Sequence, residues 1–368
     1  MAVDNFVSES QPGCHIAYYE ADWIIEASDF DPEDFGIDPC DEQLVPDIIV
    51  DPETKSLSVA NTGHDKDKSF FITTKHKALD CRGTPMATGV TRDSEGREQR
   101  VVTLVLVVKP RGVIEACYLE VSTAQACGEE PLDLFSDIKC VQPHPDPSAW
   151  KPTRSYPFPL GGGDPRLCSQ GVGGRFTHFY PGTHHALDFE CPKGTPVLSL
   201  SSGVVKQVRQ TNRAGGIHAR GLFDWNSVTI LQDDGLLAEY VHILADSALV
   251  APGDRVSAGQ PLCESGDAGF CPTPHLHLQL QEGEEDSAPT VLFALLDHEG
   301  NPYFPVAGKW YGSQGEMDAL SERRGGELGE LVESGAHVRK GEAPDERGLD
   351  GVGSCEDRCG AHVSPPSR

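Results

Sequence analysis

The stretch Pro274-His275-Leu276-His277-Leu278-Gln279-Leu280 decides how the second half of the chain folds. Leucines alternate strictly with polar side chains, and a period of two predicts a β-strand with one apolar and one polar face. His275, His277 and Gln279 share the polar face, where the two imidazoles would lie about 7 Å apart along the strand. One imidazole could bind a metal while the other reaches a metal-activated water, although a His-x-His pair alone is weak evidence.

A second segment, Thr183-His184-His185-Ala186-Leu187-Asp188-Phe189, carries a complementary pair of ligands. His184 and Asp188 are separated by three residues, which can place one nitrogen and one oxygen on the same ion as the chain enters a strand. Zinc accepts such mixed ligands and keeps one position for water in catalytic sites. The alternative interpretation is a surface histidine with a nearby carboxylate.

A third histidine, His242, stands at the end of a predicted hairpin. The apolar runs 228–231 and 236–242 flank Gln232-Asp233-Asp234-Gly235, and an Asp-Gly pair between such runs is a strong hairpin signal. Taken alone, His242 is more typical of an ordinary polar residue than of a catalytic one. Its interest comes from the other histidines.

The composition bounds the architecture and excludes some partners. A chain of 368 residues is long enough for two domains. Its formal net charge of −27, with no basic cluster, argues against nucleic-acid binding, which depends on neutralising phosphates. No run approaches the roughly 18 apolar residues of a membrane helix, so we expect no membrane span.

Local composition divides the chain into five segments and predicts a mainly β protein. Strand-like runs at 57–61, 70–74, 101–109 and 114–121 predict an N-terminal β-sandwich-like domain. Prolines and glycines mark a connector before the second domain, which again consists of short β-like runs. The predicted segments are an acidic irregular stretch (1–55), the β-sandwich-like accessory domain (56–141), the connector (142–166), an antiparallel β domain (167–311) and a disordered tail (312–368).

Twelve cysteines, none in a C-x-x-C pair, favour disulfides in an oxidising compartment. The six cysteines of residues 1–150 suggest stapling of a small core. Expected pairs are Cys263 with Cys271, Cys168 with Cys191, and Cys117 with Cys127 or Cys140. Against this, residues 1–13 show no basic start followed by an apolar run, so no signal peptide is visible. Cys355, Cys359 and His362 are too few for a metal site in a disordered tail.

Taken together and in order, these segments resemble the lysostaphin-like zinc endopeptidases, whose fold is called the duplicated hybrid motif. The resemblance covers Ser169 to Leu280. The matching segments are Ser169-Gln170-Gly171, His184-x-x-x-Asp188, Gly194-Thr195-Pro196-Val197, Ser202-Gly203-Val204-Val205, Asn226-Ser227-Val228-Thr229-Ile230, Tyr240-Val241-His242, 253–260, Ser265-Gly266-Asp267-Ala268-Gly269 and Pro274-His275-Leu276-His277.

The resemblance implies a metal site, a mechanism and a substrate. Zinc would be bound by His184, Asp188 and His277, while His242 and His275 would flank the activated water and supply the proton chemistry. No H-E-x-x-H helix supplies a glutamate base instead. The family acts on peptide bonds of bacterial peptidoglycan, which places the expected enzyme outside the cytoplasm.

Two alternatives remain open at the level of sequence. Some relatives present the first zinc histidine in a Gly-x-Phe-Ser-His lead-in, and this chain has Gly174-Arg175-Phe176-Thr177-His178, so His178 is an alternative first ligand. His185 would point away from the metal if this segment is extended. The other alternative is a catalytically silent module of the same fold that binds cell wall or regulates a hydrolase.

Overall fold

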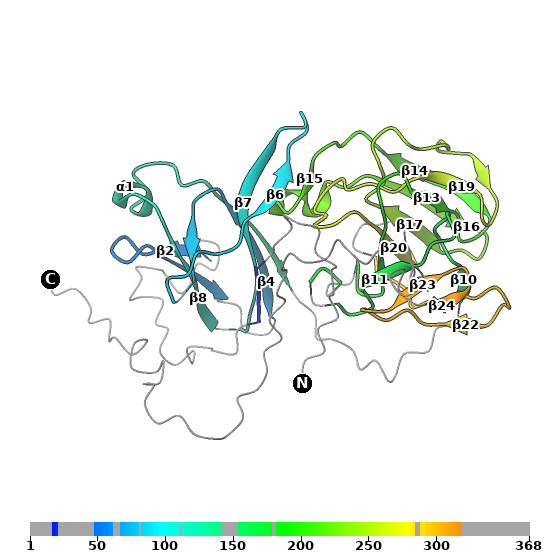
Figure 1. The fold of residues 1–368 in the computed structure, drawn as a ribbon, viewed down its shortest axis with the longest axis horizontal. Helices are drawn as coiled ribbons and strands as arrows, with labels where there is room; N and C mark the ends of the chain where they lie inside the picture. The colour runs from blue at the N-terminus through cyan, green and yellow to red at the C-terminus, as the bar shows by residue number, and fades with distance from the viewer. Residues whose placement is uncertain are drawn as a thin grey trace, which may run out of the picture.

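A computed structural model describes residues 17–20, 48–61, 67–80, 82–110, 112–140, 154–174, 176–178, 182–283 and 288–317. These residues form two β-rich lobes, the N-terminal one in blue and cyan and the C-terminal one in green to orange (Figure 1). Helical structure in the described ranges is confined to α1 (Thr123–Ala126) and the 3₁₀ helix η4 (Ala219–Phe223). The prediction of a mainly β chain is confirmed.

The N-terminal lobe is a sandwich of two sheets. One sheet has the order β15-β6-β7-β4-β9 with β1 beside β7, and the other has the order β2-β3-β8-β5. Leu57 and Val59 of β3 pack against Phe70 of β4 and Leu104 of β7 in the shared core. The strands are β1 (Ala17–Glu20), β2 (Ile48–Val50), β3 (Ser56–Asn61), β4 (Lys68–Thr74), β5 (Ala78–Leu79), β6 (Gly89–Arg92), β7 (Glu98–Val108), β8 (Gly112–Leu119) and β9 (Leu134–Cys140).

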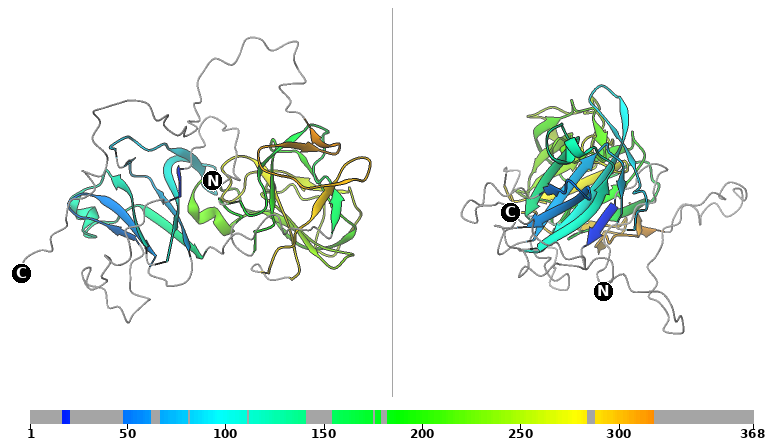
Figure 2. Two further views of the ribbon diagram at one scale, coloured as in Figure 1. Left: turned by 90° about the horizontal axis from the view of Figure 1, so that it is seen from below. Right: turned by 90° about the vertical axis from the view of Figure 1, so that its left-hand side faces the viewer.

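The C-terminal lobe, drawn in green to orange in Figure 2, is organised around one long antiparallel sheet. Its strand order is β18-β14-β16-β17-β20-β12-β11-β23-β24. Two smaller sheets, β10-β21-β22 and β13-β19, pack against it. The strands are β10 (Ser155–Pro157), β11 (Arg166–Gln170), β12 (Leu187–Glu190), β13 (Pro196–Leu198), β14 (Gly203–Arg209), β15 (Gly215–Gly216), β16 (Ser227–Gln232), β17 (Leu237–Val241), β18 (Arg255–Val256), β19 (Pro261–Glu264), β20 (His275–Gln281), β21 (Ala294–Leu296), β22 (Pro302–Tyr303), β23 (Trp310–Gly312) and β24 (Gly315–Met317).

Strand β20 lies in the middle of this sheet, between β17 and β12. Leu276, Leu278 and Leu280 are fully buried in the main hydrophobic core. Because neighbouring side chains of a strand alternate, the opposite face carries His275 and His277. The predicted strand and its two-faced character are therefore confirmed.

Several segments expected to be irregular contain strands. β1 and β2 fall in the stretch 1–55, where β1 pairs in parallel with β7 and β2 pairs with β3. β10 lies in the expected connector and pairs with β21. The β23–β24 hairpin carries ordered structure to Met317, beyond the expected start of the tail at 312. β1 and β10 obtain their hydrogen-bond partners from distant segments, which local composition does not reveal.

The expected disulfides are wrong for the cysteines whose side chains are described. Cys117, Cys127, Cys168, Cys191, Cys263 and Cys271 are free thiols. Cys168, Cys191 and Cys263 fill the hydrophobic core of the C-terminal lobe, and Cys271 donates instead to the Thr273 carbonyl at 3.0 Å. Cys14, Cys40, Cys81, Cys355, Cys359 and the side chain of Cys140 lie outside the described part. In that described part, no helix is both long and apolar enough to span a membrane.

Candidate metal centre and catalytic cleft

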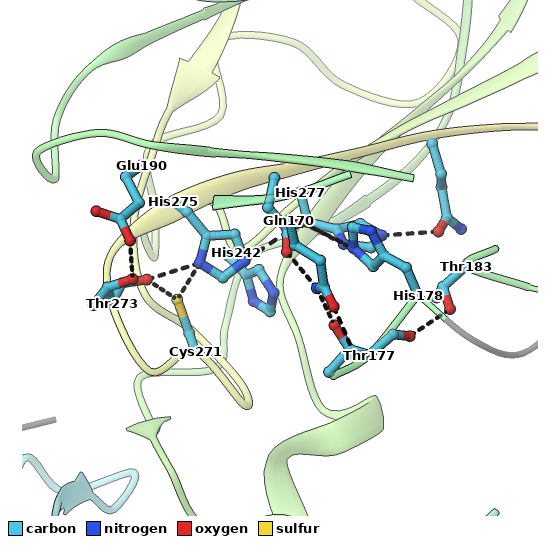
Figure 3. Close-up of polar contacts among 12 residues, drawn as sticks. Gln170, Thr177, His178, Thr183, Glu190, His242, Cys271, Thr273, His275 and His277 are labelled. Carbon is cyan, nitrogen blue, oxygen red and sulfur yellow. Dashed lines mark hydrogen bonds and ion pairs between the residues drawn. The ribbon is translucent and has the colours of Figure 1, made fainter. Parts of the chain in front are cut away.

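A cleft opens over the ends of β12, β17 and β20, where polar side chains from distant parts of the chain gather (Figure 3). Asp188 comes from β12, His277 and His275 from β20, and His242 follows β17 directly. The remaining residues that line the cleft are Ser169, Phe176, Thr177, Thr183, Leu222, Trp225, Val241, Phe270, Pro272 and Thr273.

His178, Asp188 and His277 form a compact buried cluster. Asp188 and His277 are register partners on neighbouring strands, and His277 Nδ1 lies 2.9 Å from Asp188 Oδ1. His178 Nε2 lies 3.2 Å from that same carboxylate oxygen and 3.2 Å from His277 Nδ1. Three potential ligand atoms therefore face one another.

The outer partner of each imidazole determines which ring nitrogen carries the lone pair. His178 Nδ1 lies 2.9 Å from the Gly171 carbonyl, which can only accept, so Nδ1 carries the proton and Nε2 is the acceptor. His277 Nε2 lies 2.9 Å from Gln279 Oε1, and Gln279 Nε2 donates to Glu239 at 3.1 Å, which orients the amide. In the neutral form of His277, Nδ1 is therefore the acceptor that faces the cluster, as metal binding requires.

Asp188 is held from outside the cluster by Gln170. Gln170 Nε2 donates to Asp188 Oδ2 at 2.9 Å, which leaves Oδ1 facing the histidines. Burial alone would raise the pKa of Asp188, but His178, His275 and His277 hold it well below its usual range. The carboxylate is thus ionised, as a metal ligand must be.

This donor set fits zinc. Two imidazole lone pairs and a carboxylate oxygen converge at 2.9–3.2 Å, and three acceptors so close together repel one another unless a proton or cation lies between them. Neighbouring corners of a zinc tetrahedron with nitrogen and oxygen ligands are about 3.3 Å apart, given bond lengths of about 2.0–2.1 Å. The spacing of the three atoms matches that edge closely.

Two further histidines flank the cluster. His275 Nδ1 lies 2.7 Å from the Thr273 carbonyl, and His242 Nδ1 lies 2.7 Å from the Ala268 carbonyl. Both Nδ1 atoms therefore carry the proton and both Nε2 atoms are acceptors. His275 Nε2 lies 3.7 Å from Asp188 Oδ1, so this ring reaches the edge of the cluster.

Both flanking imidazoles are neutral at pH 7. Burial, together with the neighbouring His275 and His277, lowers the pKa of His242 to about 3. Burial is also the main cause of the lowered pKa of His275. His242 has a φ of 62°, a left-handed conformation that is uncommon outside glycine and is often found at functional sites. Both residues therefore present a neutral imidazole with a free Nε2 lone pair, and His242 is a weaker base than an ordinary histidine.

The two candidate first ligands lie in different places. Among the described residues, the ligating atoms that lie within 4.8 Å of Asp188 and His277 are those of His178. The His184 ring instead contacts that of His185, with centroids 4.9 Å apart. His185 Nδ1 lies 2.7 Å from the Thr290 carbonyl. The geometry therefore favours His178, whereas the His-x-x-x-Asp spacing favours His184 and leaves His178 as the alternative.

Sequence reasoning missed the residues that orient the ligands. Gln279 shares the polar face of β20 with both histidines, so the alternating pattern could have identified it. Gln170 carries no comparable local signal, because its partners Thr177 and Asp188 are distant in sequence and meet it only in the fold. Glu239, which orients Gln279, likewise comes from another strand.

Replacing Gln279 with leucine tests the orientation of His277. Gln279→Leu keeps the volume but removes the acceptor for His277 Nε2–H, so we expect zinc affinity to fall about 10- to 100-fold. Competition with a chromophoric chelator measures the affinity. Gln281→Leu is the matched control, since Gln281 lies two residues further along the same strand and donates to the Ala288 carbonyl, away from the cluster. Equal affinities for both variants and the wild type would contradict this role.

Comparison with known proteins places the cleft in a family. Residues 182–289 match the model of peptidase family M23. The glycyl-glycine endopeptidase ALE-1 of Staphylococcus capitis is 35% identical over 99 residues, which are 27% of this chain and 24% of that protein. The peptidoglycan DD-endopeptidase ShyA of Vibrio cholerae is 35% identical over 97 residues, which are 26% of this chain and 20% of that protein. The chain thus spans about a quarter or less of these relatives.

A solved structure is also similar to part of the chain. The catalytic domain of lysostaphin from Staphylococcus simulans shows 28% sequence identity, with 36% of this chain and 86% of that chain covered and a TM-score of 0.25. The family match contains His184, Asp188, His242, His275 and His277 and begins after His178. Residues 182–289 of this chain are therefore similar to peptidase family M23, whose lysostaphin-like members the sequence resembles.

Proposed function

We propose that this protein is a zinc-dependent endopeptidase that hydrolyses peptide bonds of bacterial peptidoglycan. The observation that carries the proposal is the convergence of two imidazole lone pairs and one carboxylate oxygen beside two neutral histidines in an open cleft. The substrate class follows from the relatives, which are named as a glycyl-glycine endopeptidase and a peptidoglycan DD-endopeptidase. Action on cell wall further implies a location outside the cytoplasm.

The proposed ligands are Asp188 and His277, with His178 as the third. Gly171, Gln279 and Gln170 orient these ligands through their outer atoms. Bound zinc would supply polarisation of the scissile carbonyl and activation of a water molecule. His184 remains the alternative third ligand, because the family match and its spacing to Asp188 both point to it.

His275 and His242 provide the proton chemistry in this proposal. Each has its Nδ1 proton committed to a backbone carbonyl, so the Nε2 lone pair is available to accept a proton from water or to bond a polar group of the substrate. His275 is the better placed base, because its Nε2 lies 3.7 Å from Asp188 Oδ1 at the edge of the cluster. His242 would then orient substrate by accepting a hydrogen bond at Nε2 from a substrate N–H or O–H group.

The alternative of a silent binding module has less support. Such a module needs neither a converging set of metal ligands nor two neutral imidazoles with aligned tautomers. The converging ligands and the two neutral imidazoles are both present here. A buried set of acceptors lowers the stability of a fold, so its presence is better explained by a role in metal binding.

Digestion of purified peptidoglycan tests the function. We expect release of soluble peptides, loss of this activity on removal of zinc by a chelator, and its return when zinc is added. Mass spectrometry of the products identifies the bond that is cleaved. A protein that binds peptidoglycan but releases no peptide, with zinc bound, would instead support the silent module.

Replacing His275 separates catalysis from metal binding. His275→Ala should lower kcat about 10²- to 10⁴-fold, the usual contribution of a general base, while zinc content stays near that of the wild type. His298→Ala is the control, because His298 is an exposed histidine of the same lobe. Retention of full activity by His275→Ala would remove this residue from the mechanism.

A pair of matched variants decides the first ligand. From the geometry we expect His178→Ala to lose stoichiometric zinc, because its Nε2 lies 3.2 Å from both other ligand atoms, and His184→Ala to retain zinc. Metal content after dialysis, measured by atomic emission, gives the answer. Zinc loss in His184→Ala alone would assign the position to His184.

A further inference from the structure

The segment 265–274, which we call the orienting loop, supplies the backbone carbonyls that orient His242 and His275. It runs from the end of β19 to the start of β20. The Ala268 carbonyl accepts a hydrogen bond from His242 Nδ1–H, and the Thr273 carbonyl accepts one from His275 Nδ1–H, each at 2.7 Å. Any shift of this loop would therefore move or reorient both imidazoles.

The N-terminal lobe holds this loop through a shared backbone ladder. β15 pairs with β6, so that Gly215 lies opposite Arg92. On its other side the same short strand receives hydrogen bonds from the loop, from Gly269 N to the Ala214 carbonyl and from Cys271 N to the Gly216 carbonyl, both at 2.9 Å. The cyan β6 and the green β15 lie side by side where the lobes meet (Figure 1).

Glycine is required in β15 because the two neighbouring backbones approach so closely. A Cβ on Gly215 would lie 2.2 Å from the Asp267 carbonyl oxygen of the loop, and one on Gly216 would lie 2.5 Å from the Val90 carbonyl oxygen. Real Cβ atoms essentially never come this near. The strand is therefore fixed between the accessory lobe and the orienting loop.

Arg92 of β6 adds a direct side-chain contact. Its guanidinium donates to both carboxylate oxygens of Asp267, at 2.8 and 2.9 Å, and its Nε donates to the Arg213 carbonyl at 3.0 Å. The exposed fractions of the Arg92 and Asp267 side chains are 27% and 15%. Burial opposes ionisation of Asp267, but Arg92 and the neighbouring Lys193 lower its pKa. Asp267 immediately precedes Ala268, whose carbonyl orients His242.

An aromatic contact between the lobes fixes the centre of the loop. Phe270 packs edge-on against Phe71 of β4, with ring centroids 5.7 Å apart, and its ring is tilted against that of Phe176, with centroids 5.6 Å apart. Phe71 is 1% exposed and Phe270 is 4% exposed. Phe270 and Phe176 also line the cleft, so the accessory lobe supports the cleft wall from behind.

We propose that Arg92 is a positioning residue for the peptidase reaction, which makes the N-terminal lobe part of the catalytic apparatus. Its paired hydrogen bonds to Asp267, which we call the clamp, fix the loop. The Ala268 and Thr273 carbonyls then stay within hydrogen-bond distance of His242 Nδ1 and His275 Nδ1. The residues that line the cleft include neither Arg92 nor Asp267, so the effect runs through the loop and not through contact with substrate. The catalytic part of this inference rests on the proposed function.

Arg92→Met in the full chain tests the inference. We expect kcat on peptidoglycan peptides to fall about 10- to 100-fold, because small misplacements of catalytic groups have effects of this size. KM should stay within about twofold and zinc content should be unchanged. Asp267→Asn also weakens the ion pair of Asp267 with Lys193, so its effect should be at least as large. The double variant should lose no more than Asp267→Asn alone, since Arg92 acts through Asp267. Arg92→Lys, which keeps the charge but not the paired contact, should recover part of kcat.

Amide hydrogen exchange of residues 265–274 gives a readout that does not depend on activity. We expect faster exchange in Arg92→Met than in the wild type. Arg255→Met is the matched control, because it removes another arginine–aspartate pair, with Asp233, whose side chains are 61% and 49% exposed. Should Arg92→Met not fold, Asp267→Asn carries the same test.

The outcomes separate this inference from the proposed function. An inactive wild type with faster loop exchange in Arg92→Met would overturn the peptidase function but support the clamp. An active wild type whose Arg92→Met and Asp267→Asn variants keep wild-type kcat and wild-type exchange would overturn the clamp alone. A loss in Arg255→Met equal to that in Arg92→Met would also contradict it.

Discussion

The rest of the site depends on the approach of three buried acceptors, His178 Nε2, Asp188 Oδ1 and His277 Nδ1. Their separations of 2.9–3.2 Å are unfavourable unless a positive charge lies among them. The antiparallel register of β12 and β20 sets Asp188 opposite His277, while the third atom comes from the segment before β12. The fold therefore creates an electrostatic demand that a cation satisfies, which is why we treat the cluster as a metal centre.

The surrounding polar residues give the two nitrogens of each imidazole different roles, one as hydrogen-bond donor and the other as ligand or proton acceptor. In all four histidines of the site, one ring nitrogen is committed to a carbonyl or amide oxygen and the other faces the cluster or the cleft. The partners come from several strands and from the loop 265–274. Because a rigid sheet and a second lobe support them, the orientation is established before substrate arrives, as efficient catalysis requires.

Much of this could be predicted from sequence, and the failures have physical causes. The alternation of leucine and histidine fixed β20 and its two faces, since period two is a local property. The prediction of His184 as first ligand rests on His-x-x-x-Asp spacing, which is a local rule, whereas the position of His178 depends on tertiary contacts such as Gln170 with Thr177. The disulfide predictions failed because buried cysteines such as Cys263 pack as small apolar side chains.

X-ray absorption at the zinc edge of the purified full chain tests the metal centre most directly. It also separates the cluster from the adjacent group of His242, Cys271 and His275, whose ligating atoms lie within 4.8 Å of one another and include a sulfur. We expect one bound zinc with only nitrogen and oxygen ligands at about 2.0–2.1 Å, including two imidazoles. A sulfur ligand at about 2.3 Å, or no stoichiometric zinc, would contradict this expectation.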